Sequence, residues 1–216
     1  MRPVRVGDTV RRPSHHRSAY VDALLRHLAD AGFTGAPRPL GYDEAGRQIL
    51  TYVPGEVPDG AGPYRLSDAR IRSATTLIRS FHDATATSVL REDREVVCHG
   101  DLGPHNTVFR GERAVALIDF EDDVGPGRRL DDFAQAVWGF ADLTEAGVAV
   151  AEQARKTRLM CDVYGDVTPP AVVEALTARF RRAHDQHVAA ELPGAVRVFA
   201  DLLAWMDRFG GQIAGA

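Results

Sequence analysis

VVCHGDLGPHNTVF, residues 96–109, places a tight polar loop between two apolar runs. The flanking runs are typical of buried strands, and the glycines and proline between them are typical of turns. The loop carries four polar side chains, those of His99, Asp101, His105 and Asn106. A chain that holds polar groups this closely between two buried strands is expected to use them chemically.

A second polar position follows thirteen residues after Asn106, where Asp119 ends an apolar strand in the sequence LIDFED. Two strands joined by a turn at residues 111–112 would bring Asn106 and Asp119 together. Amide and carboxylate oxygens are hard ligands suited to Mg²⁺, and Asp101 is then placed to accept a hydroxyl proton. Phosphoryl transfer to an alcohol requires these groups, and their spacing matches the protein-kinase catalytic loop. Turn residues that cap strands explain a lone Asp-x-x-x-x-Asn, but they do not explain the whole run.

Composition limits the other classes of function. The chain has 216 residues, of which 44% are hydrophobic, and this is enough for one large domain or two small lobes. Its formal net charge of −4 argues against nucleic acid as the main partner. No apolar run reaches the ~18 residues of a membrane helix. Cys98 and Cys161 form no disulfide framework, so we expect reduced, buried thiols and a cytoplasmic location.

The hydrophobic spacing divides the chain into unlike halves. The first half is mixed: it predicts a hairpin over 4–13, a helix over 18–31 that Ser18 caps and Gly32 ends, and strands over 39–42 and 48–53. Residues 58–63 indicate a linker or loop. Beyond them the pattern is mainly helical, with helices expected over 67–84, 131–143, 144–164, 169–190 and 194–209. The only strands expected in this second half are 95–98, 107–110 and 114–119.

HGDLGPHN, with the later segment LIDFEDDVGPGRRLDDFAQAVW, resembles the aminoglycoside phosphotransferase family, which also includes choline, homoserine and sugar kinases. The resemblance covers residue 5 to about residue 138. It implies an α+β, protein-kinase-like fold of two lobes. Residues 1–56 would form a reduced, β-rich N-terminal lobe with the hinge, and residues 57–216 a mainly helical C-terminal lobe.

The resemblance also implies roles for single residues. Asp101 would be the catalytic base, and His99 would support the catalytic loop. Asn106 and Asp119 would be the Mg²⁺ ligands. Asp132 falls where the family has an aspartate packed under the catalytic loop, and a carboxylate at a helix N-terminus explains that residue too.

The segments expected to bind the nucleotide resemble the family in one respect and differ from it in two. ILTYVPGE resembles the family's hinge, where backbone groups around Tyr52 and Val53 would hold the base of ATP or GTP. Only one hairpin fits before residue 13, and the strand offers Arg11 and Arg12 where a lysine is usual. Strand alternation turns one of them inward, and Arg12 is favoured because it shares a face with an apolar residue. The next helix has Asp22 but no glutamate, so the usual Lys–Glu pair is absent or shortened.

The acceptor is predicted from charge alone. Glu121, Asp122 and Asp123 form an acidic cluster that would suit a cationic hydroxyl acceptor, such as an amino sugar or an amino alcohol; solvated loop charges are the alternative. The expected function is therefore a small-molecule kinase. A catalytically silent binding module, a kinase with a macromolecular acceptor and a helical hydrolase are the alternatives. The retained Asp101, Asn106 and Asp119 favour the kinase.

Overall fold

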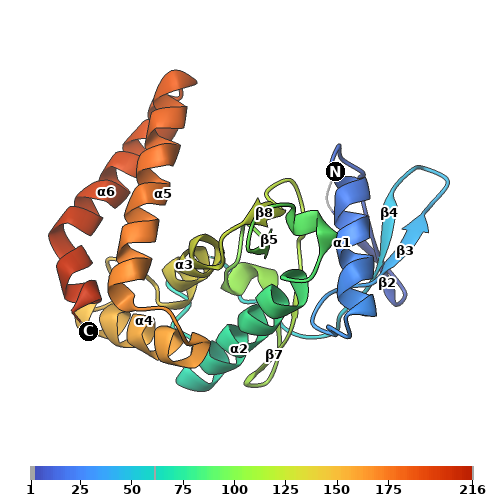
Figure 1. The fold of residues 1–216 in the computed structure, drawn as a ribbon, viewed down its shortest axis with the longest axis horizontal. Coiled ribbons are helices and arrows are strands. Elements are labelled where there is room, and N and C mark those ends of the chain that lie inside the picture. The colour runs from blue at the N-terminus through green and yellow to red at the C-terminus, as the bar shows by residue number, and fades with distance from the viewer. Residues whose placement is uncertain (1–2, 61, 216) are drawn as a thin grey trace.

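The structure, a computed structural model, describes residues 3–60 and 62–215. It has the expected α+β composition, with a sheet and one helix at one end and helices at the other (Figure 1). The first elements are β1 (Val4–Val6), β2 (Thr9–Arg12), α1 (Ser18–Asp30), β3 (Pro39–Tyr42) and β4 (Gln48–Thr51). The four strands form one antiparallel sheet in the order β1-β2-β4-β3. A single hairpin thus precedes α1, as the sequence predicts.

The start of α1 differs from the expectation. Arg17 occupies the N-cap position, and no side chain caps the helix there. Ser18 is instead the first helical residue, and its hydroxyl accepts a hydrogen bond from the backbone N–H of His15 at 2.9 Å. The hydroxyl therefore fixes the loop that enters the helix. At the other end the predicted stop is present, because Gly32 adopts a positive φ of 76°.

The remaining elements follow an extended connection. They are α2 (Asp68–Thr85), β5 (Val96–Cys98), β6 (Thr107–Arg110), β7 (Arg113–Leu117), β8 (Gly125–Gly127), α3 (Arg129–Phe140), α4 (Val150–Tyr164), α5 (Pro169–Ala189) and α6 (Pro193–Ala214). Short 3₁₀ turns occur at Val89–Arg91 and Pro104–Asn106. Ser67 caps α2 by accepting a hydrogen bond from the N–H of Arg70.

In this half two helix boundaries were predicted wrongly by five residues or more, and one strand was missed. α4 begins at Val150 rather than at Thr144, because residues 144–149 form turns and Thr144 has a positive φ of 69°. α6 continues to Ala214, beyond the expected end at residue 209. β8 was not expected at all, since Gly-Pro-Gly has little strand propensity. Its pairing with β5 is a tertiary contact, and it holds the segment that follows Asp119 against the start of the polar loop at residues 99–106.

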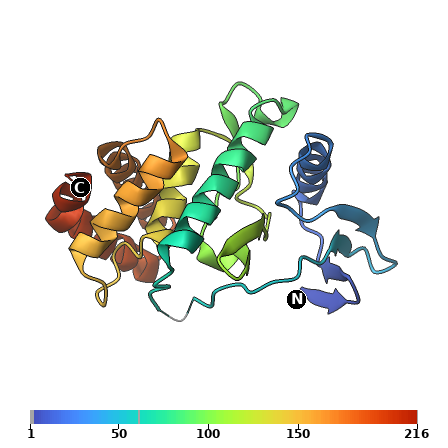
Figure 2. The same ribbon diagram turned by 90° about the horizontal axis from the view of Figure 1, so that it is seen from below.

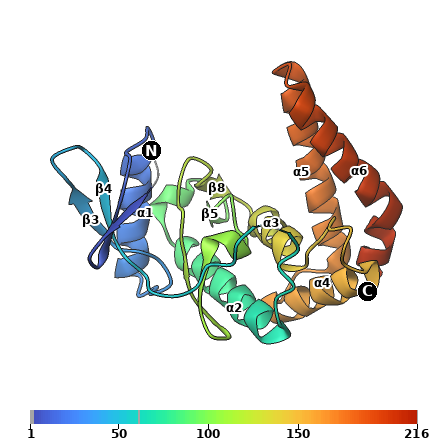
Figure 3. The ribbon, with the colours of Figure 1, turned by 180° about the vertical axis from the view of Figure 1, so that it is seen from behind.

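The connection between β4 and α2 runs along one side of the molecule (Figure 2). It is held at Glu56, whose backbone N–H and carbonyl both bond to Phe109 of β6, at 2.8 and 2.7 Å. The predicted loop at 58–63 has no helix or strand where it is described; its residue 61 lies outside the described residues. At the far end, α5 and α6 pack side by side and project from the molecule (Figures 1 and 3).

One hydrophobic core runs from α1 through α2 and α3 to α5 and α6. Its largest fully buried side chains are aromatic: Phe81, Phe109, Phe120, Phe133, Phe140 and Phe180. Both cysteines are free, Cys161 buried and Cys98 partly so. Burial raises the pKa of the Cys161 thiol to about 12, which keeps it protonated. Over the described part of the chain, no helix has the length and apolar character needed to span a membrane.

Candidate active site

Asp101 lies on the loop between β5 and the 3₁₀ turn, with its side chain 45% exposed. Asn106 donates from Nδ2 to the Asp101 carboxylate Oδ2 and to the Asp101 carbonyl, both at 2.9 Å. His105 Nε2 lies 3.3 Å from the same Oδ2. The His105 hydrogen bond is the main cause that holds the pKa of Asp101 below its usual range, and it outweighs partial burial. Asp101 is therefore a carboxylate ready to accept a proton.

Asp132 lies beneath this loop. Its two carboxylate oxygens accept hydrogen bonds from the backbone N–H groups of His99 and Gly100, each at 2.8 Å, and from His82 Nε2 at 3.0 Å. Burial raises the pKa of Asp132, but the hydrogen bond from His82 and the neighbouring imidazoles lower it further, so the net shift is downward. A buried carboxylate thus fixes the backbone that carries Asp101.

His99 lies on the buried side of the loop. Its Nε2 is 2.9 Å from the carbonyl oxygen of Ile118 and must donate to it, since a carbonyl only accepts. Burial lowers the pKa of His99, so the ring is neutral. Among the described residues its Nδ1 has no hydrogen-bond partner. His99 therefore connects the loop before Asp101 to the residue before Asp119.

The β6–β7 hairpin brings Asn106 and Asp119 together. Thr107 pairs with Leu117, and the N–H of Ile118 donates to the carbonyl of Asn106 at 2.9 Å. Asp119 is exposed and adopts a positive φ of 65°, which is rare for a residue with a side chain.

The donor set at this point fits Mg²⁺. Both hydrogen bonds that the Asn106 side chain makes use Nδ2, so its Oδ1 has no partner among the described residues. No described cation lies within salt-bridge distance of Asp119, although Glu121 is close enough to hydrogen-bond to it. Burial and then the charge of Asp119 raise the pKa of Glu121. An amide oxygen beside two repelling carboxylates is an arrangement that a hard divalent cation would stabilise.

A cleft of about 190 Å³ lies between the sheet and the β6–β7 hairpin. Four of the predicted residues line it: Arg12, Tyr52, Val53 and Asp119. The remaining walls include the apolar side chains of Val10, Leu50, Val108 and Ile118. The N–H of Tyr52 is already bonded to the carbonyl of Asp8 at 2.8 Å. The backbone of Val53 has no partner among the described residues, so it is the free hydrogen-bonding edge of this cleft.

Of the two strand arginines, Arg12 turns inward. It is 4% exposed, and its Nη2 donates to the carbonyl of Phe120 at 2.6 Å. Burial lowers the pKa of Arg12, while Glu121 and Asp119 oppose that shift. Arg11 points away from the cleft and lies 3.6 Å from Asp43.

Gln48 was missed by the sequence analysis. Its Oε1 accepts from Arg12 Nε at 2.6 Å, and its Nε2 donates to Asp22 Oδ1 at 2.5 Å. The alternation of side chains along the strand could have indicated it, because Gln48 lies on the same face as Leu50, and these two are the buried positions of β4. A fully buried polar side chain next to a buried arginine is expected to have a defined partner.

The three residues of the acidic cluster, Glu121, Asp122 and Asp123, have different neighbours and do not form one continuous acidic surface. Glu121 lies beside Asp119 and 3.8 Å from Arg12 Nη1, whereas Asp122 lies 2.6 Å from His15 Nδ1. The backbone of Asp123 runs so close to Gly100 that a side chain at position 100 would collide with it.

A second cavity, of about 270 Å³, opens on another side of Asp101. The acidic cluster does not line it. Its walls are Tyr64, Asp101, Leu102, His105, Gln135, Trp138, Gly139, Asp142, Leu143, Thr144 and Glu145. Gln135 is only 8% exposed, and its Oε1 has no hydrogen-bond partner in the described part of the chain. Beyond the polar loop, no pattern in the sequence indicates this cavity, because its other lining residues come from two segments that are far apart in the chain, Tyr64 and the run from Gln135 to Glu145.

Comparison with known proteins shows the family of the chain. The profile of the phosphotransferase enzyme family matches residues 80–159, which include the loop that carries Asp101 and also Asp119. The trifolitoxin immunity protein of Rhizobium leguminosarum bv. trifolii is 35% identical over 184 residues, covering 74% of this chain and 69% of that protein. The chain belongs to the phosphotransferase enzyme family.

Solved structures confirm the protein-kinase-like fold. A choline/ethanolamine kinase family protein from Mesorhizobium loti aligns over 99% of this chain and 89% of its own, at 18% identity and a TM-score of 0.55. The GDP complex of aminoglycoside 2'-phosphotransferase-IIIa aligns over 95% and 87%, at 13% identity and a TM-score of 0.61. An ADP-bound aminoglycoside phosphotransferase, APH(2'')-Ib, aligns over 94% and 92%, at 16% identity and a TM-score of 0.60. The predicted family and fold class are thus both confirmed.

Proposed function

We propose that the protein transfers the γ-phosphate of ATP or GTP to a hydroxyl group of a small, amine-bearing alcohol. One arrangement carries this proposal: Asp101 and Asn106 stand between two cavities. Asp101 lines one of them, while Asn106 bonds both to Asp101 and, through its carbonyl, to the strand end that lines the other. A reaction that joins two substrates requires such a shared wall. Residues 1–56 and 57–216 would serve as the two lobes around the nucleotide.

The chain's own residues supply most of the chemistry. Asp101 would accept the hydroxyl proton as the acceptor oxygen attacks the γ-phosphorus. The backbone of Val53 would bond to the base, and Arg12 would direct its remaining N–H groups to the phosphates. Asn106 and Asp119 would hold Mg²⁺, with Glu121 adjacent. When bound, the ion would neutralise charge on the phosphate oxygens.

We place the acceptor in the cavity beside Asp101 rather than on the acidic cluster. Gln135 Oε1 is a buried acceptor to which none of the described residues donates, and an ammonium or hydroxyl group would satisfy it. Glu145 is exposed on the wall, and Trp138 offers an aromatic face. About 270 Å³ is small for a ligand site, so a single amino-sugar ring or an amino alcohol fits better than a multi-ring compound.

An acceptor screen tests the proposal. Release of ADP or GDP is measured with Mg-ATP and Mg-GTP against a panel of amino alcohols and single-ring amino sugars, with acceptor-free reactions as the baseline. Asp101→Asn should lower acceptor-dependent turnover by about 10²-fold or more, and Gln135→Leu should raise KM with little change in kcat. If Asp101→Asn reacts at the parental rate, the base is assigned wrongly.

A binding function is the second candidate, because the 35%-identical relative is named as an immunity protein. The protein would then protect a cell by sequestering a toxic compound rather than by phosphorylating it. Asp101→Asn separates the two in a cell-protection assay against trifolitoxin: protection by sequestration survives the substitution, whereas protection by phosphorylation is lost.

A further inference from the structure

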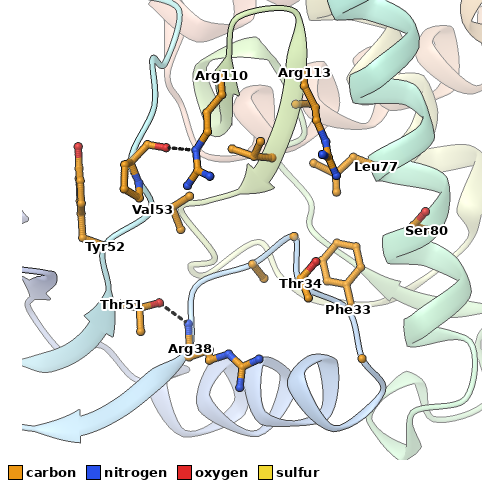
Figure 4. A pocket seen from close by; sticks show the side chains of 16 residues that line it. Phe33, Thr34, Arg38, Thr51, Tyr52, Val53, Leu77, Ser80, Arg110 and Arg113 are labelled. Carbon is orange, nitrogen blue, oxygen red and sulfur yellow. Dashed lines mark hydrogen bonds between the residues drawn. The ribbon is translucent and has the colours of Figure 1, made fainter.

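A larger cavity, of about 670 Å³, lies against the hinge (Figure 4). Its walls come from the α1–β3 connection, the hinge at residues 51–54, one face of α2 and the β6–β7 hairpin. Thr51, Tyr52 and Val53 line both this cavity and the proposed nucleotide cleft. None of the proposed catalytic or metal residues lines it, so it is a separate site.

The charged side chains that line this cavity are all positive. Arg38, Arg110 and Arg113 line it, and no aspartate or glutamate is among its lining residues, although the whole chain has a net charge of −4. Arg110 and Arg113 extend from the β6–β7 hairpin, and Arg38 lies across the cavity beside α1 (Figure 4).

The side chains of these arginines are largely available to a ligand. Arg110 donates from Nε to the carbonyl of Pro54 at 2.9 Å, which leaves its terminal nitrogens for a ligand. The side chains of Arg38 and Arg113 form no hydrogen bond or ion pair with any residue that the structure describes. Many other arginines are paired with carboxylates, among them Arg47, Arg70, Arg128, Arg129 and Arg155.

We propose that this cavity binds a small polyanion, a phosphorylated or polycarboxylate metabolite, through its oxyanion groups. Guanidinium groups bind phosphate and carboxylate in the same bidentate geometry. Bringing three cations to one cavity without a counter-charge costs electrostatic energy, and a bound anion removes that cost. The hydroxyls of Thr34 and Thr51 add further donors to the walls.

The size of the site argues for a small molecule. The arginines face each other around a cavity rather than along an extended basic surface, which nucleic acid would need. The position also couples the site to the hinge, because Arg110 holds the carbonyl of Pro54. An anion that engages Arg110 would therefore act on the segment that contacts the nucleotide.

Calorimetry with pyrophosphate and with citrate, at constant ionic strength and without nucleotide, tests the proposal. The parent should bind at least one of them saturably; pyrophosphate alone indicates a phosphorylated ligand, and citrate alone a polycarboxylate. The double variant Arg38→Gln/Arg113→Gln should bind at least about tenfold more weakly, a change of about 1.4 kcal/mol. Arg72→Gln/Arg182→Gln, which removes the same charge from exposed helix positions, should bind like the parent.

Two outcomes of the calorimetry would overturn the proposal. One is saturable binding of neither anion by the parent. The other is undiminished binding by Arg38→Gln/Arg113→Gln, which would place the anion elsewhere, such as at Arg12 in the nucleotide cleft. A second readout does not depend on these variants: the Nε–H signal of Arg110 in the parent should shift during the titration, and an unchanged signal also counts against the site.

Discussion

Arg12 and Asp22 are joined through the side-chain amide of Gln48, whose Oε1 accepts from Arg12 Nε at 2.6 Å and whose Nε2 donates to Asp22 Oδ1 at 2.5 Å. Tyr42 completes the chain by donating to Asp22 Oδ2 at 2.6 Å. The sequence predicts that the usual Lys–Glu pair is absent or shortened, and in the structure Gln48 spans the distance between Arg12 and Asp22. Arg12 is thereby held with Nη2 on the carbonyl of Phe120, next to Asp119.

The first prediction concerns this bridge. Gln48→Leu keeps the volume but leaves Arg12 Nε and Asp22 Oδ1 buried without a partner. It should lower the free energy of unfolding by about 2–4 kcal/mol, since each bond involves a charged group, and it should weaken Mg-ATP binding. Urea unfolding and calorimetry measure the two effects. Gln186→Leu, on the exposed face of α5, is the matched control and should change neither. Parental stability of Gln48→Leu would contradict the bridge.

The sequence could predict the parts of the site that depend on local spacing. Asp101 and Asn106 share one loop, and a two-strand hairpin fixes Asn106 relative to Asp119, so their proximity follows from the chain itself. The Gln48 bridge and the cavity around Gln135 could not be predicted in this way. They depend on contacts between β2, β4 and α1, or between α3 and a distant loop, and local patterns carry no information about such packing.

Element boundaries show the same division. The strands at Pro39–Tyr42 and Thr107–Arg110 were predicted with their observed ends, because turn residues bound them. β8 could not be predicted, since Gly125–Gly127 becomes a strand only by pairing with β5. The start of α4 was missed because residues 144–149 keep helical spacing while they form turns.

The second prediction concerns pH. His105 is the main cause that keeps the pKa of Asp101 below its usual range. Asp101 must be ionised to accept a proton, so the acid limb of kcat in the parent should lie below the ordinary aspartate range. His105→Phe removes the donor, and the pKa of Asp101 should rise. Activity of the variant should therefore fall at a higher pH than activity of the parent, while the two differ less near neutrality.

Tyr64→Phe is the control for this pH shift. It removes the hydroxyl that lies 3.2 Å from His105 Nδ1 but leaves the bond between His105 and Asp101. Its acid limb should match that of the parent even if KM changes. Circular dichroism at each pH shows that the loss of activity precedes unfolding. Superimposable acid limbs for His105→Phe and the parent would remove His105 from this role.

The third prediction compares neighbouring aspartates. The carboxylate of Asp132 accepts three hydrogen bonds. Asp132→Asn replaces one carboxylate oxygen with an NH₂ group that would face a hydrogen-bond donor, so the substitution should cost about 2–4 kcal/mol of stability. Asp131→Asn removes only a surface pair with Arg128 and should cost under about 1 kcal/mol. Because the folded pKa of Asp132 is lowered, this stabilisation is complete above the ordinary value of 3.8 and is lost as the pH falls through the folded pKa.

Urea denaturation of both variants at pH 7, and of the parent from neutral to acid pH, measures these effects. Similar losses for Asp131→Asn and Asp132→Asn would show that the buried carboxylate does not anchor the catalytic loop.

The fourth prediction separates strain from chemistry at Asp119. Its positive φ of 65° suits glycine, and a side chain there costs of the order of 1 kcal/mol. Asp119→Gly should therefore be more stable than Asp119→Ala by about that amount. Both variants should lose the Mg²⁺-dependent part of nucleotide binding, measured by calorimetry with and without Mg²⁺. Asp93→Asn, on an exposed loop, is the control. Retained Mg²⁺ dependence in Asp119→Gly would place the ion elsewhere.

The last prediction concerns the two strand arginines. A single hairpin covers the cleft, so few donors are available to the nucleotide phosphates, and we expect Mg-ATP affinity in the high micromolar range or weaker. Arg12 lines the cleft and Arg11 does not, so Arg12→Ala should weaken binding about tenfold or more, whereas Arg11→Ala should leave it unchanged. Since Arg12 is buried, Arg12→Lys is measured as well; it keeps a cation but loses the bidentate geometry, and its affinity should fall between those of the parent and Arg12→Ala. Titration of Mg-ATP into folded samples of all four proteins decides the matter. Equal affinity throughout would exclude both arginines from nucleotide binding and would favour a silent binding module over a kinase.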